Sequence, residues 1–166
     1  LEDGRLVAAG PDGIAILNNN GWYNLVPSED KWAVYNHNSE DYDEFVSDTA
    51  QFRSARAWSM IEDNKGLWIS LQGVFSARND FNEPIGGGVI KFFPDDPGAT
   101  VIYDTTAGQI SAWDQRGYMN VRGLTIDKKS RLWISNFGAG HLDRKVSVSD
   151  NEGNWYHIQQ IGYGGI

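Results

Sequence analysis

Residues 121–135, with the sequence VRGLTIDKKSRLWIS, decide the fold of this chain. Two short apolar runs in this stretch are separated by the polar residues 127–130, which begin with aspartate and end with serine. Short runs of β-branched and aromatic residues around such a polar segment are typical of two β-strands joined by a turn. The stretch therefore predicts a β-hairpin.

The same pattern occurs three times along the chain. Val7, Trp68 and Trp133 occupy one position in the three copies, and an apolar run leads into the second and third copies at residues 57–63 and 121–127. Two more predicted strands follow each copy, at residues 13–17 and 20–25, 88–93 and 100–103, and 145–149 and 153–158. Four short antiparallel strands per repeat are typical of one blade of a β-propeller.

The repeats predict an all-β chain that forms a partial propeller over residues 1–166. We expect blade one at residues 1–26, without its inner strand, blade two at 55–104 and blade three at 120–160. A closed propeller has about four to eight blades, so we expect further blades or further copies of the chain to complete the ring. Because the chain begins in the middle of a blade, we also expect it to be a piece of a longer polypeptide.

Composition narrows the classes of partner. The net charge of −8 argues against nucleic acid or an anionic membrane as the main partner, because both select for basic patches. The chain has no cysteine, so it has no disulfide, thiol nucleophile or cysteine-bound metal. No stretch approaches the roughly 18 apolar residues of a membrane helix, so we expect no membrane insertion in this segment.

The third repeat resembles a known family. It runs from Val121-Arg122-Gly123-Leu124 through Leu132-Trp133-Ile134-Ser135 to the turn Gly153-Asn154-Trp155, and it is similar to the two-component-regulator propeller repeat. The second copy matches apart from one missing residue, and the first departs by having Val7 in place of tryptophan. The resemblance covers nearly the whole chain and implies a propeller. This family includes sensor domains of hybrid histidine kinases and PorZ-like propellers of type IX secretion.

Within this family, the long insertions of the chain favour the secretion-type proteins. The resemblance then implies a non-enzymatic binding or scaffold module of a secreted or cell-surface bacterial protein, located outside the cytoplasm. Its partners would be other protein subunits of a surface or secretion complex, or a polysaccharide. Two alternatives stay open: the periplasmic ligand-sensing propeller of a hybrid two-component histidine kinase, and a glycan-active propeller hydrolase or lyase.

The surplus residues lie in three insertions, at 27–53, 75–87 and 104–120. Binding residues often lie on loops that a rigid scaffold supports. The second insertion joins the second and third strands of blade two, and the third leads from blade two into blade three. In a four-stranded meander both connections leave from the same face, so we expect them to meet. The candidate ligand-binding residues on these two loops are Arg78, Asp80, Phe81, Trp113, Arg116 and Tyr118.

Other notable residues have structural explanations. We expect Trp68 and Trp133 to pack between blades, and Trp22 and Trp155 to cap blade edges. Asp63 and Asp127 follow the inner strands, where a carboxylate can accept hydrogen bonds from the backbone of a turn. Arg56 and Arg122 flank the inner strands, and we expect surface or inter-blade salt bridges from them, with an axial funnel as the alternative for Arg122. Residues 86–88, three glycines, predict a sharp turn or a close backbone approach.

No catalytic residue, metal site or cofactor is identified. His37, His141 and His157 share neither repeat position nor metal-ligand spacing. The acidic residues of 40–44 and Asp48 lack the spacing of a calcium loop, and Asp80, Asn82, Glu83, Asp95 and Asp96 are weaker candidates; calcium binding is therefore unsupported. We expect a protein that is not an enzyme.

Overall fold

A computed structural model gives the fold of the chain. The residues that it describes are 4–10, 13–18, 21–27, 32–36, 41–45, 55–73, 86–96, 99–104, 110, 119–137, 145–150 and 152–158. These residues form 13 β-strands in three antiparallel sheets and no α-helix, which confirms the predicted all-β class. None of the described segments forms a helix with the length and apolar character that a membrane span requires.

The second and third sheets each contain four strands in sequence order. The strands of the second sheet are β6 (Ala55–Asp63), β7 (Gly66–Gly73), β8 (Gly87–Phe92) and β9 (Val101–Tyr103). Those of the third sheet are β10 (Val121–Ile126), β11 (Leu132–Asn136), β12 (Val146–Ser149) and β13 (Trp155–Ile158). All eight coincide with strands expected from the repeat.

The first sheet has five strands and corrects one expectation. Its strands are β1 (Leu6–Gly10), β2 (Gly13–Asn18), β3 (Gly21–Pro27), β4 (Trp32–Asn36) and β5 (Asp41–Phe45). We expected an inserted loop at residues 27–53, but β4 and β5 lie there and extend the sheet beyond β3. The physical reason is local, because β4 reads Trp-Ala-Val-Tyr-Asn and is rich in residues that favour strands.

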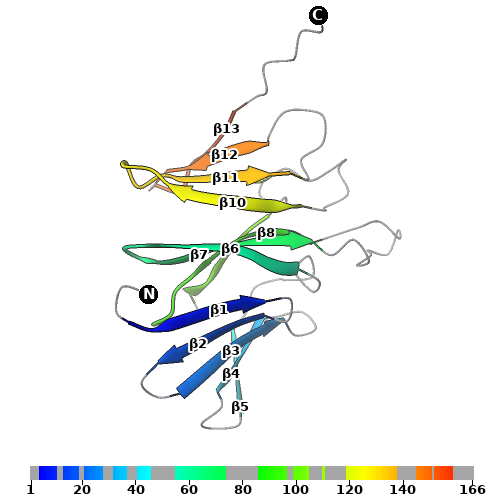
Figure 1. Ribbon diagram of the computed structural model, residues 1–166, viewed down its shortest axis with the longest axis vertical. Coiled ribbons are helices and arrows are strands. Elements are labelled where there is room, and N and C mark those ends of the chain that lie inside the picture. Colours follow the sequence, from blue (N-terminus) through cyan, green and yellow to red (C-terminus); the bar gives the residue numbers. More distant parts are fainter. Residues whose placement is uncertain are drawn as a thin grey trace, which may run out of the picture.

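The three sheets are stacked along the long axis of the molecule in sequence order (Figure 1). The first strands of the sheets lie next to one another: β6 contacts β1 on one side and β10 on the other. An ion pair between Arg5 and Asp95, with 2.8 Å between Nη1 and Oδ1, also joins the first sheet to the β8–β9 connection.

The main apolar core lies between the second and third sheets. The third sheet contributes Val121, Leu132 and Ile134, and the second contributes Val89, with Ile61, Trp68 and Tyr103 packed at its margin. Trp68 and Trp155 both contact the ring of Tyr103, at centroid distances of 5.6 and 5.3 Å. Side chains alternate along each strand, so Trp68 faces the third sheet while Leu67 and Ile69, both buried, face the first.

Candidate functional site

Matching irregularities occur near the start of β6 and of β10. In β6 the register shifts between Ala57 and Ser59, so Trp58 is an extra residue, and in β10 the shift between Val121 and Gly123 makes Arg122 the extra one. Bulges of this kind redirect a side chain and are frequent beside functional sites. The two residues occupy the same repeat position, and both side chains are exposed.

The two bulges place Trp58 and Arg122 in contact. The guanidinium carbon of Arg122 lies 4.6 Å from the ring centroid of Trp58 and 5.5 Å from that of Phe137, the residue after β11. We call these three residues the Trp58–Arg122–Phe137 cluster. The relative exposure is 53% for Trp58 and 78% for Phe137. Two exposed aromatic residues beside one cation form a candidate binding surface.

Buried Asn120 holds the cluster in position. Its Oδ1 accepts a hydrogen bond of 3.0 Å from Nε of Arg122, and its carbonyl oxygen accepts one of 2.8 Å from the backbone N–H of Phe137. Its own backbone N–H donates to Oδ1 of Asn136, which is also buried. Ser59 Oγ donates to the carbonyl oxygen of Arg122 and ties the bulge of β10 to β6. The cluster is therefore fixed on a rigid base.

The same edge brings together the bases of two predicted insertions. The N–H of Met119 donates to the carbonyl of Gly86 over 2.8 Å, and the carbonyl of Met119 accepts from the N–H of Gly73 over 2.9 Å. Gly87 has φ +98°, and a Cβ there would overlap the carbonyl oxygen of Met119. The expected close backbone approach is confirmed at Gly87, and the end of the longer connection lies beside both ends of the shorter one.

The candidate ligand-binding residues on these insertions lie outside the described residues. This applies to Arg78, Asp80, Phe81, Trp113, Arg116 and Tyr118. Ile110 and Met119, which belong to the longer connection and are described, are buried in the core between the second and third sheets. Two described residues of this connection are therefore part of the core.

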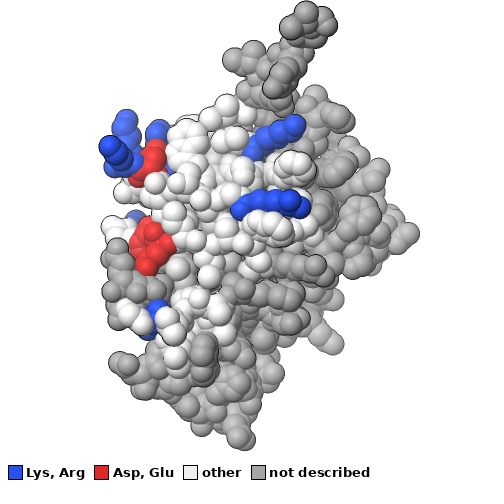
Figure 2. Space-filling model, in the orientation of Figure 1, with Lys and Arg blue, Asp and Glu red and all other residues white. Residues whose placement is uncertain are grey.

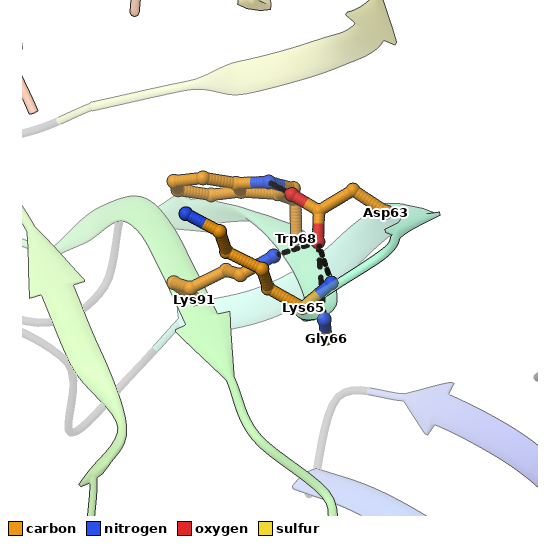
Figure 3. Close-up of polar contacts among 5 residues, drawn as sticks. All are labelled: Asp63, Lys65, Gly66, Trp68 and Lys91. Atoms are coloured by element: carbon orange, nitrogen blue, oxygen red, sulfur yellow. Dashed lines mark hydrogen bonds and ion pairs between the residues drawn. The ribbon is translucent and has the colours of Figure 1, made fainter. Parts of the chain in front are cut away.

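Asp63 joins the β6–β7 turn to the inter-sheet core. Its Oδ1 accepts from the backbone N–H groups of Lys65 and Gly66, as the turn interpretation predicted, and its Oδ2 accepts from the indole of Trp68 over 2.7 Å. The ammonium group of buried Lys91 also donates to Oδ1. Figure 3 shows the carboxylate of Asp63 between the indole of Trp68 and the ammonium group of Lys91. Lys91 in turn lies 4.6 Å from the centroid of the Trp68 ring.

Two opposing influences set the pKa of Asp63. Partial burial raises it, but the hydrogen bonds from Lys91, from the backbone of Lys65 and from Trp68 together hold the pKa below its ordinary value of 3.8. Burial acts on Lys91 as well and lowers the pKa of its ammonium group against the attraction of Asp63. The direct contact of the two groups is that of a charged pair, so we assign both charges to this site at neutral pH.

The third sheet repeats this arrangement without the lysine. Asp127 accepts from the backbone N–H groups of Lys129 and Arg131 and, over 2.9 Å, from the indole of Trp133. Its ion pair with Arg131, together with the indole, holds the pKa of Asp127 well below 3.8. At the position of Lys91 the third sheet has Val148, which pairs with Trp133. Both aspartates therefore serve the turn and orient a tryptophan.

The other structural expectations have mixed outcomes. Trp68 packs against the third sheet as predicted, whereas half-buried Trp133 lies on the outer face of that sheet, with Arg131 over its ring. Trp155 was expected at a blade edge but packs on the core. Arg122 is at the surface, yet it contacts aromatic rings and, among the described residues, no carboxylate. The side chains of Trp22 and Arg56 lie outside the described residues.

The polar groups considered for chemistry are only partly described. His157 shares a hydrogen bond of 2.8 Å with Ser147, and His37 and His141 lie outside the described residues, as do Asp48, Asp80, Asn82 and Glu83. Strand β5 includes most of the acidic stretch 40–44, whose side chains are not described. Within the described part of the chain, no group of three or more His, Cys, Asp or Glu residues could hold a metal ion.

Sequence reasoning missed Trp58 and Phe137 as site residues. Both lie in the repeat, where an aromatic residue is expected to be core, and the bulge that turns Trp58 outward leaves no mark in the repeat pattern. One signal was available: at the shared position of Trp58 and Arg122 the two copies carry a ring and a cation, which can attract each other. Figure 2 shows acidic and basic side chains together along one edge of this face, and on the other side basic side chains with no acidic one beside them among the described residues.

Comparison with known protein families, curated proteins and solved structures gave no match to this chain.

Proposed function

We propose that this chain is part of a β-propeller that acts as a non-enzymatic binding or scaffold module of a secreted or cell-surface bacterial protein. The partners are other protein subunits of a surface or secretion complex. The proposed resemblance to PorZ-like propellers of type IX secretion rests on the repeat residues alone. The arrangement of the sheets supports the propeller part of the proposal, and the exposed aromatic–cation cluster supports the binding part.

One observation carries the propeller proposal. The face of the second sheet that carries Trp68 packs against the third sheet. The equivalent face of the third sheet is also apolar. That face carries Trp133 and Val148, together with Tyr156 and Ile158, which are 56% and 48% exposed. At the other end of the stack Leu6 occupies the position of buried Leu67 and is 62% exposed. Each end of the stack thus offers the kind of surface that adjacent sheets bury against each other.

The variant Ile158→Lys tests this packing in the protein as the cell makes it. If another blade covers the outer face of the third sheet, the lysine must bury a charge, and the melting temperature should fall by several degrees. Asn64→Lys, in an exposed turn between β6 and β7, is the matched control and should melt like the original protein. Equal melting temperatures for the two variants would contradict the propeller.

Protein cross-linking on intact bacterial cells tests the binding role. We expect the tagged protein to be accessible to external protease and to cross-link to a small set of surface proteins. A protein that is protected from protease inside the cell would exclude the surface role. Turnover of a glycan panel that is abolished by a single carboxylate substitution would show an enzyme instead.

A further inference from the structure

The terminal nitrogens of Arg122 are not used by the part of the chain that the structure describes. Its Nε donates to Asn120, and its plane lies over the rings of Trp58 and Phe137. In contrast, Arg5, Lys91 and Arg131 each form an ion pair with an aspartate. In a chain with a net charge of −8, an exposed arginine without a carboxylate partner among the described residues stands out.

The contacts of Arg122 orient its guanidinium group for one kind of ligand. A guanidinium group offers two parallel N–H donors that match the two oxygens of a carboxylate. Asn120 and the rings restrain the plane of this group, so little freedom is lost when a ligand binds. A partner that covers the two rings would also exclude water from part of the site, which strengthens an ion pair formed there. The expected ligand group is therefore a carboxylate.

The composition of the cluster favours a protein as the source of that carboxylate. Tryptophan and arginine are among the residues most enriched where protein interfaces gain their binding energy. Each ring of the cluster gives one of its faces to the guanidinium, and that face is then not available to stack on a sugar. The surface therefore presents the guanidinium group of Arg122 between the apolar edges of two aromatic rings.

We propose that the Trp58–Arg122–Phe137 cluster is a docking site for a protein segment that presents an aspartate or glutamate side chain between apolar residues. The carboxylate takes the terminal nitrogens of Arg122, and the flanking apolar side chains cover Trp58 and Phe137. This inference rests on the proposed binding function and names the chemistry of the partner at one site.

Titration with short capped peptides, followed by NMR, tests the proposal. The probe has one glutamate between two leucines, the control peptide has glutamine instead, and the reporter is the Nε–Hε signal of Arg122. The glutamate peptide should shift this signal and bind about tenfold more tightly than the glutamine peptide, as expected for hydrogen bonds to a charged group. Equal binding of the two peptides would overturn the proposal.

Variants and a second probe sharpen the test. Arg122→Lys retains the charge but lacks the planar pair of donors, so it should weaken binding of the glutamate peptide several-fold, and Arg122→Met should abolish its advantage over the glutamine peptide. Lys128→Met, in the exposed β10–β11 turn, removes an equal charge elsewhere and should bind normally. Oligogalacturonate, an acidic sugar, should bind more weakly than the peptide; tighter binding of the sugar would refute a protein partner.

The outcome of the peptide test can be distinguished from the outcomes of the packing and cell-surface tests of the proposed function. If the peptide fails but Ile158→Lys lowers the melting temperature and surface cross-links form, the propeller binds its partners through another surface. If the peptide binds as expected while the packing and cell-surface tests fail, the docking site is real and the larger assembly is wrong.

Discussion

At the scale of single residues, one carboxylate in each of the second and third sheets holds both a turn and a tryptophan. Asp63 and Asp127 differ in their charged partners. Asp63 pairs with Lys91, whose place in the third sheet is taken by Val148, and Asp127 pairs instead with Arg131, which is partly exposed. Lys91 lies in the interior, with a side chain that is 5% exposed. The two aspartates therefore form a natural comparison between a carboxylate that neutralises a buried charge and one that does not.

Asp63→Asn should destabilise the protein by about 3 kcal/mol, because it leaves the buried ammonium group of Lys91 without its counter-charge. Asp127→Asn is the matched control, as it disturbs the same turn and indole contact but affects only a partly exposed arginine. Its effect on the free energy of unfolding, measured with urea, should be clearly smaller. A double variant, Asp63→Asn with Lys91→Met, should recover part of the loss; no recovery would contradict the ion-pair explanation.

Acid should weaken the fold through the same aspartates. Their pKa values lie below 3.8 in the folded protein and return to about that value on unfolding. The stability that they contribute is therefore complete above the unfolded value and is lost as the pH falls through the folded value. Melting temperatures should be level near neutral pH and decline below about pH 4. Asp127→Asn should flatten this decline, and an unchanged slope would show that other groups cause it.

At the scale of elements, the repeat predicted most strands because turn residues separate short runs of β-forming residues. Strands β4 and β5 were missed, since the Ser-, Asn- and Asp-rich composition around them outweighed the strand-forming run at residues 32–36. The bulges were also missed. A bulge depends on how two strands pair, and no local pattern shows that Trp58 is the extra residue. The cluster of Trp58, Arg122 and Phe137 joins β6 to the β10–β11 hairpin, which is distant in the sequence, so it appears only in the folded chain.

The approach of β8 to the connection before β10 gives an element-scale prediction. Gly87→Ala should destabilise the protein by about 2 kcal/mol or more, because its Cβ must displace the backbone of Met119 and the residue must keep a positive φ. Gly153→Ala is the control: it has φ +85° with open space around the new Cβ, so only the backbone strain of about 1 kcal/mol remains. Chemical denaturation compares the two variants, and equal losses would show that the close approach is unimportant.

At the scale of the whole molecule, aromatic rings join the outer strands of neighbouring sheets. Tyr103 of β9 lies between Trp68 and Trp155, so it links the two sheets away from their first strands. The indole nitrogen of Trp155 is buried and finds no acceptor among the described residues. The ring therefore contributes through its apolar area, while its N–H group opposes burial.

Replacing Trp155 separates these two contributions. Trp155→Ala should cost about 3 kcal/mol or more, because it removes a large ring from the packing between sheets. Trp155→Phe retains much of the ring and removes the unpaired donor, so its cost should be much smaller, and a slight gain is consistent with relief of a buried polar group. Thermal unfolding of both variants provides the measurement. Similar losses for Phe and Ala would mean that the indole N–H has a partner after all.

The two faces of each sheet differ in their side chains, and successive sheets are oriented in the same way, so the stack has a direction. The second sheet turns its tryptophan toward the third sheet and its leucine and isoleucine toward the first, so the two faces of a sheet are not interchangeable. If the outer face of the third sheet in one copy of the chain packs against the outer face of the first sheet in another, the two copies join head to tail. A twofold axis would instead place each face against the same face of the other copy. Head-to-tail contacts either close into a ring or continue as a filament. The curvature between successive sheets then decides which of these two assemblies forms.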